Sequence, residues 1–256
     1  VYEEGIRTNS VSYGQNCVDL FISGANPRTM TLSAGLQYEH FNYKSFLWSS
    51  DQDIYIVEPQ GFVNYYIRGD MESLDDRYFP SRGMRLDTRL MVHTDNAYQY
   101  DEGLPFLSIL YGFQGIWSPN NRITILPSFY GRTLIGEKVA YPYLNAMGGE
   151  IEGRYVSHQI PFTGIGHMEY FDNSLVGLAL EARLRIFARN YVSVKGSFAL
   201  HDDNFFGMFT QMGEKNIWGV GVKYSYNSPI GPLSLLLDMS NRSQGIGAYF
   251  SIRKSF

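Results

Sequence analysis

Apolar and polar side chains alternate along most of this chain. The clearest segment spans 178–186, where leucine, alanine and isoleucine take every second position and Glu181, Arg183 and Arg185 lie between them. Because the side chains of a β-strand point alternately to the two faces of a sheet, these three charges share one face. That face can point neither into lipid nor into a dry core, whereas the opposite face can.

The same period of two recurs from about residue 18 to the end of the chain. We count about twelve strands of roughly nine to thirteen residues, the length that a tilted membrane-spanning strand needs. Clear apolar faces are those of Val18, Leu20 and Ile22; Leu32, Ala34 and Leu36; Met84, Leu86 and Leu90; Ile123, Ile125 and Phe129; Val192, Val194 and Phe198; Trp218, Val220 and Val222; and Leu233, Leu235 and Leu237. The pattern predicts an all-β protein, a transmembrane antiparallel β-barrel.

Connections between these strands are alternately short and long. Short, turn-rich connections lie at 118–121, 188–190 and 227–232, and longer polar ones at 49–60, 94–103 and 201–216. Outer-membrane barrels have short periplasmic turns and long extracellular loops. No linker or repeat divides the chain, so we expect a single barrel domain over 1–256, with one long loop at about 137–173.

Composition favours this interpretation. Of the 256 residues, 16% are aromatic and 18% are charged, whereas a soluble domain carries about 25% charged residues. Girdles of aromatic residues at the membrane interfaces explain both departures. No apolar run is long enough for a spanning helix. The net charge of −4 gives no reason to expect nucleic acid, and Cys17 alone cannot form an internal disulfide. Because the chain begins at Val1 without a leader, we expect a removed signal peptide or a longer parent protein.

Motifs for catalysis or metal binding are weak. There is no Gly-x-Ser-x-Gly nucleophile motif, and the five histidines lack ligand spacing. Acidic pairs at 51–53 and 202–203 are better explained as solvated loop charges than as a calcium site. We therefore expect no enzyme activity in this chain, no metal and no cofactor.

Two segments break the strand pattern and carry a family resemblance. The first is 77–86, with a Phe79-Pro80-Ser81-Arg82-Gly83 turn, and the second is 148–164 within the long loop. With the 227–232 turn and the closing Phe-Ser-Ile-Arg-Lys-Ser-Phe, they resemble the bacterial surface-antigen superfamily. That superfamily includes the barrel of the outer-membrane assembly machine, two-partner secretion transporters and barrels fused to patatin-like phospholipases. This chain is most similar to the patatin-linked barrels.

The resemblance implies a location in the bacterial outer membrane and a loop folded back into the lumen. The family barrel has sixteen strands, so this chain would be its C-terminal part or a smaller cylinder. Gly153, Arg154 and Tyr155 would form the docked loop tip. Since an unpaired buried guanidinium costs several kcal/mol, we expect Glu181 or Asp238 as the partner of Arg154.

Other charges share the inward phase with these two carboxylates. They are Arg85, Asp87, Arg89, Arg183, Arg185, Lys195 and Lys223. We interpret them as a charge-paired interior, with a solute-selecting eyelet as the alternative. Phe250, Ile252 and Phe256 of the last strand are expected to form an assembly signal read by the outer-membrane assembly machinery.

These inferences predict a membrane anchor that takes part in polypeptide translocation or insertion. Its expected partners are outer-membrane lipid, the assembly machinery and a client polypeptide. The chief alternative is a passive porin-like barrel that conducts small solutes or lipid, and a third is a soluble β-rich carrier. Any patatin-like phospholipase activity would lie in a domain that this chain does not contain.

Overall fold

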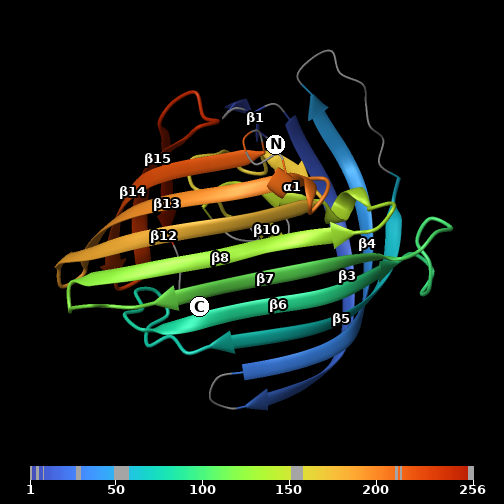
Figure 1. Ribbon diagram of the computed structural model, residues 1–256, viewed down its shortest axis with the longest axis horizontal. Coiled ribbons are helices and arrows are strands. Elements are labelled where there is room, and N and C mark those ends of the chain that lie inside the picture. Colours follow the sequence, from blue (N-terminus) through green and yellow to red (C-terminus); the bar gives the residue numbers. More distant parts are fainter. Residues whose placement is uncertain are drawn as a thin grey trace.

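A single large antiparallel sheet dominates the computed structural model, which describes residues 2–3, 6–7, 9–26, 30–48, 58–150, 158–210, 213 and 215–252 (Figure 1). Eleven strands pair in chain order, each with the next. They are β3 (Asn9–Asn26), β4 (Met30–Trp48), β5 (Gln60–Glu72), β6 (Gly83–Thr94), β7 (Phe106–Ile116), β8 (Ile123–Ile135), β12 (Ser174–Phe187), β13 (Asn190–Asp202), β14 (Asn216–Ser228), β15 (Gly231–Ser240) and β16 (Gly247–Ile252). The predicted all-β antiparallel fold is confirmed, with eleven strands in this sheet.

The remaining elements are short. Strands β1 (Tyr2–Glu3) and β2 (Ile6–Arg7) pair with each other, and α1 (Gly207–Thr210) follows β13. Between β8 and β12, a 3-10 helix η1 (Tyr141–Tyr143) precedes a small sheet of β9 (Asn145–Met147), β10 (Gln159–Ile160) and β11 (Tyr170–Asp172). The long loop expected at 137–173 therefore contains structure of its own. Among the described residues, no helix is long and apolar enough to span a membrane.

The alternation of side chains sets the two faces of the large sheet. Leu180 is 53% exposed, whereas Arg183 on the opposite face is only 6% exposed. The register aligns the apolar positions across neighbouring strands, as where Val194 pairs with Val222 and Val222 with Leu237. A continuous apolar outer surface results, of the kind that faces lipid in a barrel.

Side chains of the long loop fill the concave side of the sheet. One core cluster packs loop residues against inward residues of the strands β12 to β14. A second packs Ala140 and Tyr143 against inward phenylalanines of β4, β5 and β7. The loop thus contacts both halves of the wall from inside.

The two edges of the large sheet are β3 and β16. Figure 1 shows the sheet curling strongly, and within the described residues no pairing joins these two strands. The curved wall is therefore open along a seam. A sheet closes only where strand number and stagger match.

Adjacent residues of β12 point to opposite faces of the sheet, and this allows a direct test of which face contacts lipid. Replacing outward Leu180 by arginine should lower the free energy of unfolding in lipid vesicles by about 2–4 kcal/mol, the cost of a cation at the bilayer midplane. Its neighbour Ala179 points inward, so Ala179→Arg is the matched control and should cost much less. Equal losses in urea titrations of the two variants would contradict the assignment of the faces.

Candidate functional site

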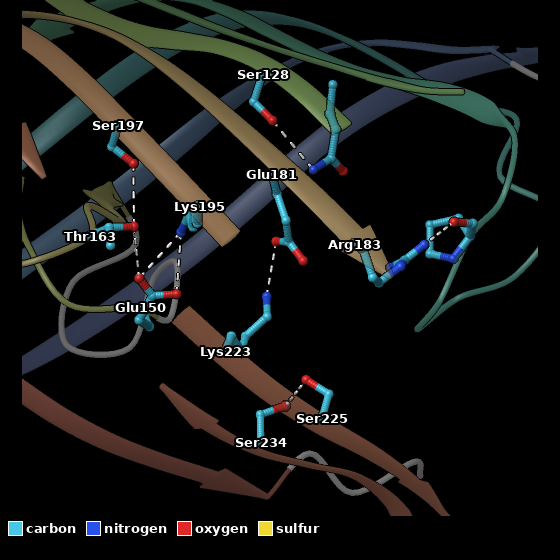
Figure 2. Close-up of polar contacts among 12 residues, drawn as sticks. Ser128, Glu150, Thr163, Glu181, Arg183, Lys195, Ser197, Lys223, Ser225 and Ser234 are labelled. Carbon is cyan, nitrogen blue, oxygen red and sulfur yellow. Dashed lines mark hydrogen bonds and ion pairs between the residues drawn. The ribbon is translucent and has the colours of Figure 1, made fainter. Parts of the chain in front are cut away.

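The loop docks on the inner face of β13 through a buried carboxylate. Glu150 accepts hydrogen bonds from Lys195 Nζ at 3.2 Å and from Thr163 Oγ1 at 3.1 Å (Figure 2). Ser197, two residues after Lys195 on the same face, donates to Thr163 Oγ1 at 3.3 Å. Both charged groups are largely buried, so this ion pair stabilises the docked loop more than a surface pair would.

Glycines bring the loop backbone directly onto β14 and β15. Gly164 N donates to Asp238 Oδ2 at 2.9 Å and has a φ of +89°, which favours glycine. A side chain at Gly219 of β14 would overlap the carbonyl oxygen of Thr163. The segment from Thr163 to Gly164 can therefore lie flush against the wall only because these positions lack a Cβ. We call this contact with Lys195, Gly219 and Asp238 the wall dock.

A second dock holds the first part of the loop to β4 and β5. Tyr143 Oη donates to Glu39 Oε2 at 2.5 Å and accepts from Asn64 Nδ2 at 2.9 Å, and Asn64 also donates to Glu39 at 2.8 Å. Burial, followed by the nearby carboxylate of Glu39, raises the pKa of Tyr143, which keeps the hydroxyl protonated as the donor. Gln15 of the edge strand β3 donates to the same carboxylate at 2.6 Å. We call this contact the tyrosine dock.

Further buried groups support the tyrosine dock. His93 bridges Asn64 and Ser108 through its two ring nitrogens, at 2.9 and 2.8 Å. Arg132 Nη1 donates to the backbone oxygen of Tyr143 at 2.5 Å. The Tyr143 ring packs edge-on against Phe62, with centroids 5.0 Å apart. Nearly every polar atom near Glu39 thus has a partner, as burial requires.

The turn between β5 and β6 folds inward at the opposite end of the wall. Phe79 stacks on Tyr191 of β13 at a centroid distance of 4.1 Å, and the Arg183 guanidinium lies 5.6 Å from the Phe79 ring centre. Arg183 also donates to the backbone oxygen of Pro80. We call this arrangement the arginine clamp.

The turn itself is internally braced. Asp75 accepts from the backbone and hydroxyl of Ser81, and Asp76 accepts from the backbone of Tyr78 and Phe79. Desolvation raises the pKa of Asp75, but the hydrogen bonds from Ser81 and from the backbone of Arg82 together outweigh it, so the pKa of Asp75 is lowered. The clamp therefore holds a preformed turn of the Phe-Pro type singled out in the sequence.

The expected lumen residues have different surroundings. Glu181 pairs with Lys223 at 2.9 Å, and Asp238 accepts from the loop backbone. Arg183 belongs to the clamp, whereas Arg185 lies on the same strand face but is exposed at the strand end.

The structure describes only some of the residues expected to form the loop tip and the assembly signal. Phe250 and Ile252 of β16 are exposed. Gly153, Arg154, Tyr155 and Phe256 lie outside the described residues.

A cavity of about 430 Å³ lies between the loop and the clamped turn. Its lining includes Phe79 and Pro80 of the turn, His158 and Pro161 of the loop, and the Glu181–Lys223 pair of the wall. Serine, tyrosine and leucine side chains make up much of the rest. Within the described part of the chain, no group of three or more acidic, histidine or cysteine side chains could hold a metal ion. The cavity is thus a partly open compartment of mixed polar and apolar lining, bordered by the loop and by the turn between β5 and β6.

Comparison with known proteins decides the family. The model of the OMP85 superfamily matches residues 2–256. The chain belongs to the OMP85 superfamily. No curated protein sequence matches it.

The crystal structure of BamA from Haemophilus ducreyi lacking POTRA domains 1–3 has the same fold. It matches with a TM-score of 0.65 at 14% identity, over 94% of this chain and 53% of that one. The chain thus spans about half the length of the BamA chain that it matches. As a member of the OMP85 superfamily, it is a barrel protein of the bacterial outer membrane.

Sequence reasoning about this OMP85 barrel missed the tyrosine dock. Glu39 lies between outward Tyr38 and His40, so its inward phase was available as a signal for a lumen carboxylate. The role of Tyr143 was not readable, because a loop has no period that fixes its side-chain direction.

The arginine clamp generates a proteolysis prediction. Arg183→Gln removes a charge-assisted hydrogen bond of about 1.5–3 kcal/mol, so the open population of the turn should rise on the order of ten- to a hundredfold. Trypsin should then cleave faster after Arg77 in the turn, as followed by mass spectrometry of the protein in detergent. Arg185→Gln, an exposed change on the same strand face, is the control. An unchanged rate at Arg77 in the Arg183 variant would show that the clamp does not hold the turn.

The tyrosine dock generates a stability prediction. Tyr143→Phe leaves the buried carboxylate of Glu39 with one donor fewer and should lower the free energy of unfolding by about 1.5–3 kcal/mol. Adding Glu39→Gln should recover part of the loss, because a neutral amide needs less compensation. Tyr98→Phe, at an exposed tyrosine, should change little. Additive losses from the Tyr143 and Glu39 changes would contradict the coupling that the dock implies.

Proposed function

We propose that this chain anchors its protein in the outer membrane and serves as a gated element for the translocation or insertion of polypeptide. One observation carries the proposal: a structured loop occupies the lumen and is docked on both halves of a wall that is itself open between β3 and β16. A wall whose edge strands do not pair over their described residues suits an element that must change its closure.

The loop acts as the plug in this proposal. Gly153, Arg154 and Tyr155 form its tip, and Arg154 binds Glu181 or Asp238. Both carboxylates already accept a hydrogen bond, from Lys223 and from Gly164, at 2.9 Å each. Since a carboxylate has about four lone-pair positions, each retains capacity for a guanidinium.

The edges supply the contact with a client. An unpaired strand edge presents a row of N–H and C=O groups that an incoming strand can pair with. In the proposal a client polypeptide adds to β3 or β16, and the assembly machinery reads the outward Phe250 and Ile252. The apolar outer face contacts outer-membrane lipid.

A passive conducting barrel is the second candidate. The observation in its favour is the mixed-charge cavity of about 430 Å³ in the lumen. Rings of charged side chains select ions and solutes in pores. Residues of the loop and of the clamped turn, however, border this cavity and narrow the lumen there.

Conductance in planar bilayers distinguishes the two candidates. The full chain should conduct little, and deletion of Gly149 to Gly164 should open a steady pore because the wall dock is lost. The variant Asp238→Asn, which weakens one contact only, should give brief openings. A large steady conductance that is the same before and after the deletion would establish the passive barrel and exclude the plug.

Contact with a client needs a separate measurement. Cys17 is an exposed thiol on the edge strand β3. An unfolded outer-membrane polypeptide with single cysteines should form a disulfide with Cys17 when its strand pairs there, and should not do so after Cys17→Ser. If cross-linking to Cys17 is no greater than to a cysteine placed at Glu137 in the loop, pairing at this edge is wrong.

A further inference from the structure

The segment after β13 lies against the outer surface of the barrel wall. It contains α1, which contacts β13, and Met208 of α1 is fully buried. Figure 1 shows α1 at the end of β13 and beside the wall. Because 203–215 is one of the long connections, this end of the wall belongs to the outer leaflet.

The burial of Leu200 shows which side of the wall the segment covers. In the register Leu200 lies on the same face as Phe198, which is 37% exposed and pairs with outward Leu178 and Trp218. Leu200 itself is only 5% exposed, although it points outward. Since Met208 of the adjacent α1 is also buried, the segment covers Leu200 from the lipid side.

Two aromatic side chains of this segment stand outward from it. Phe206 is 76% exposed and Phe209 is 45% exposed. Both contact the Phe205 ring edge-on, with centroids 5.4 and 5.5 Å away. Asn204 fixes the backbone by accepting from Phe206 N at 2.9 Å. The exposed rings are therefore held in place by the segment.

We propose that Phe206 and Phe209 insert into the outer-leaflet interface and contact lipid acyl chains. α1 follows the end of β13, whose outward face carries Phe198, so the exposed rings lie toward the membrane interface, where aromatic side chains are favoured. The charge beside α1, that of Asp202 at the end of β13, is paired with Lys215 at 3.7 Å. Exposed aromatic rings next to a paired charge suit the boundary between headgroups and acyl chains.

This inference concerns the membrane and does not rest on translocation. The rings of Phe206 and Phe209 add apolar area beyond the ends of the strands. This area sets how deep the wall lies in the outer leaflet. The segment also contacts β13, the strand that carries Lys195 of the wall dock.

Depth-dependent fluorescence quenching tests the contact. Tryptophan is introduced as Phe206→Trp in a chain with Trp48→Phe, Trp117→Phe and Trp218→Phe, and the full chain is reconstituted into vesicles with lipids brominated at shallow or deep acyl positions. Shallow bromines should quench the new tryptophan strongly, and deep ones less. Heat-modifiable migration on gels confirms folding of each variant.

Two matched controls define the limits. A chain that retains only Trp218 gives the quenching of a strand residue on the lipid face. A chain with Glu137→Trp, in the same background without tryptophan, reports an exposed loop and should be quenched by aqueous acrylamide alone.

Two results would overturn the proposal. If Phe206→Trp behaves like Glu137→Trp, the segment is in water. If neither bromolipid nor acrylamide quenches it and cross-linked pairs of chains appear, a second copy covers the rings instead of lipid.

Discussion

The interior of a membrane offers no water to backbone polar groups or to ions, and this constraint governs the whole molecule. Neighbouring strands of a single antiparallel sheet satisfy one another's N–H and C=O groups except along the outer edges of β3 and β16, and the charges within those strands, apart from Asp202 at the end of β13, point to the concave side. There they find partners, as Lys195 does with Glu150 and Lys223 with Glu181. The loop follows from the same need, because it brings Glu150 and many buried apolar side chains into the lumen.

The two docks of the loop use different physics. At the wall dock the contact is backbone against backbone, made possible by Gly164 and Gly219 and strengthened by the Asp238 carboxylate. At the tyrosine dock a ring fills an aromatic pocket while its hydroxyl meets the buried carboxylate of Glu39. The wall dock would therefore be disrupted by a side chain added at Gly164 or Gly219. The tyrosine dock would be weakened by loss of the Tyr143 hydroxyl, which donates to Glu39.

Sequence patterning determined which face each strand residue occupies, and therefore the fold class. At 178–186 it placed Leu180 outward and Arg183 inward, and both assignments are confirmed. The strand pattern and the composition also indicated the membrane, whereas the inward-folded loop came from the family resemblance. What could not be predicted is which side chains meet inside the wall, such as Tyr143 with Glu39 and the Phe79 turn with Arg183. These contacts join residues far apart in sequence, and a period of two carries no information about them.

The loop also connects the flanks of the seam. Glu39 accepts from Gln15 on the edge strand β3, so the tyrosine dock reaches one edge, while Asp238 of β15 lies next to β16 at the other. Each hydrogen bond to a carboxylate contributes about 1.5–3 kcal/mol, and the total stability of a protein is about 5–15 kcal/mol. Releasing one dock is therefore within reach of the binding energy of a paired strand, whereas releasing both approaches the cost of unfolding. The loop thus connects the two flanks of the seam through contacts whose combined free energy is comparable with the stability of the whole protein.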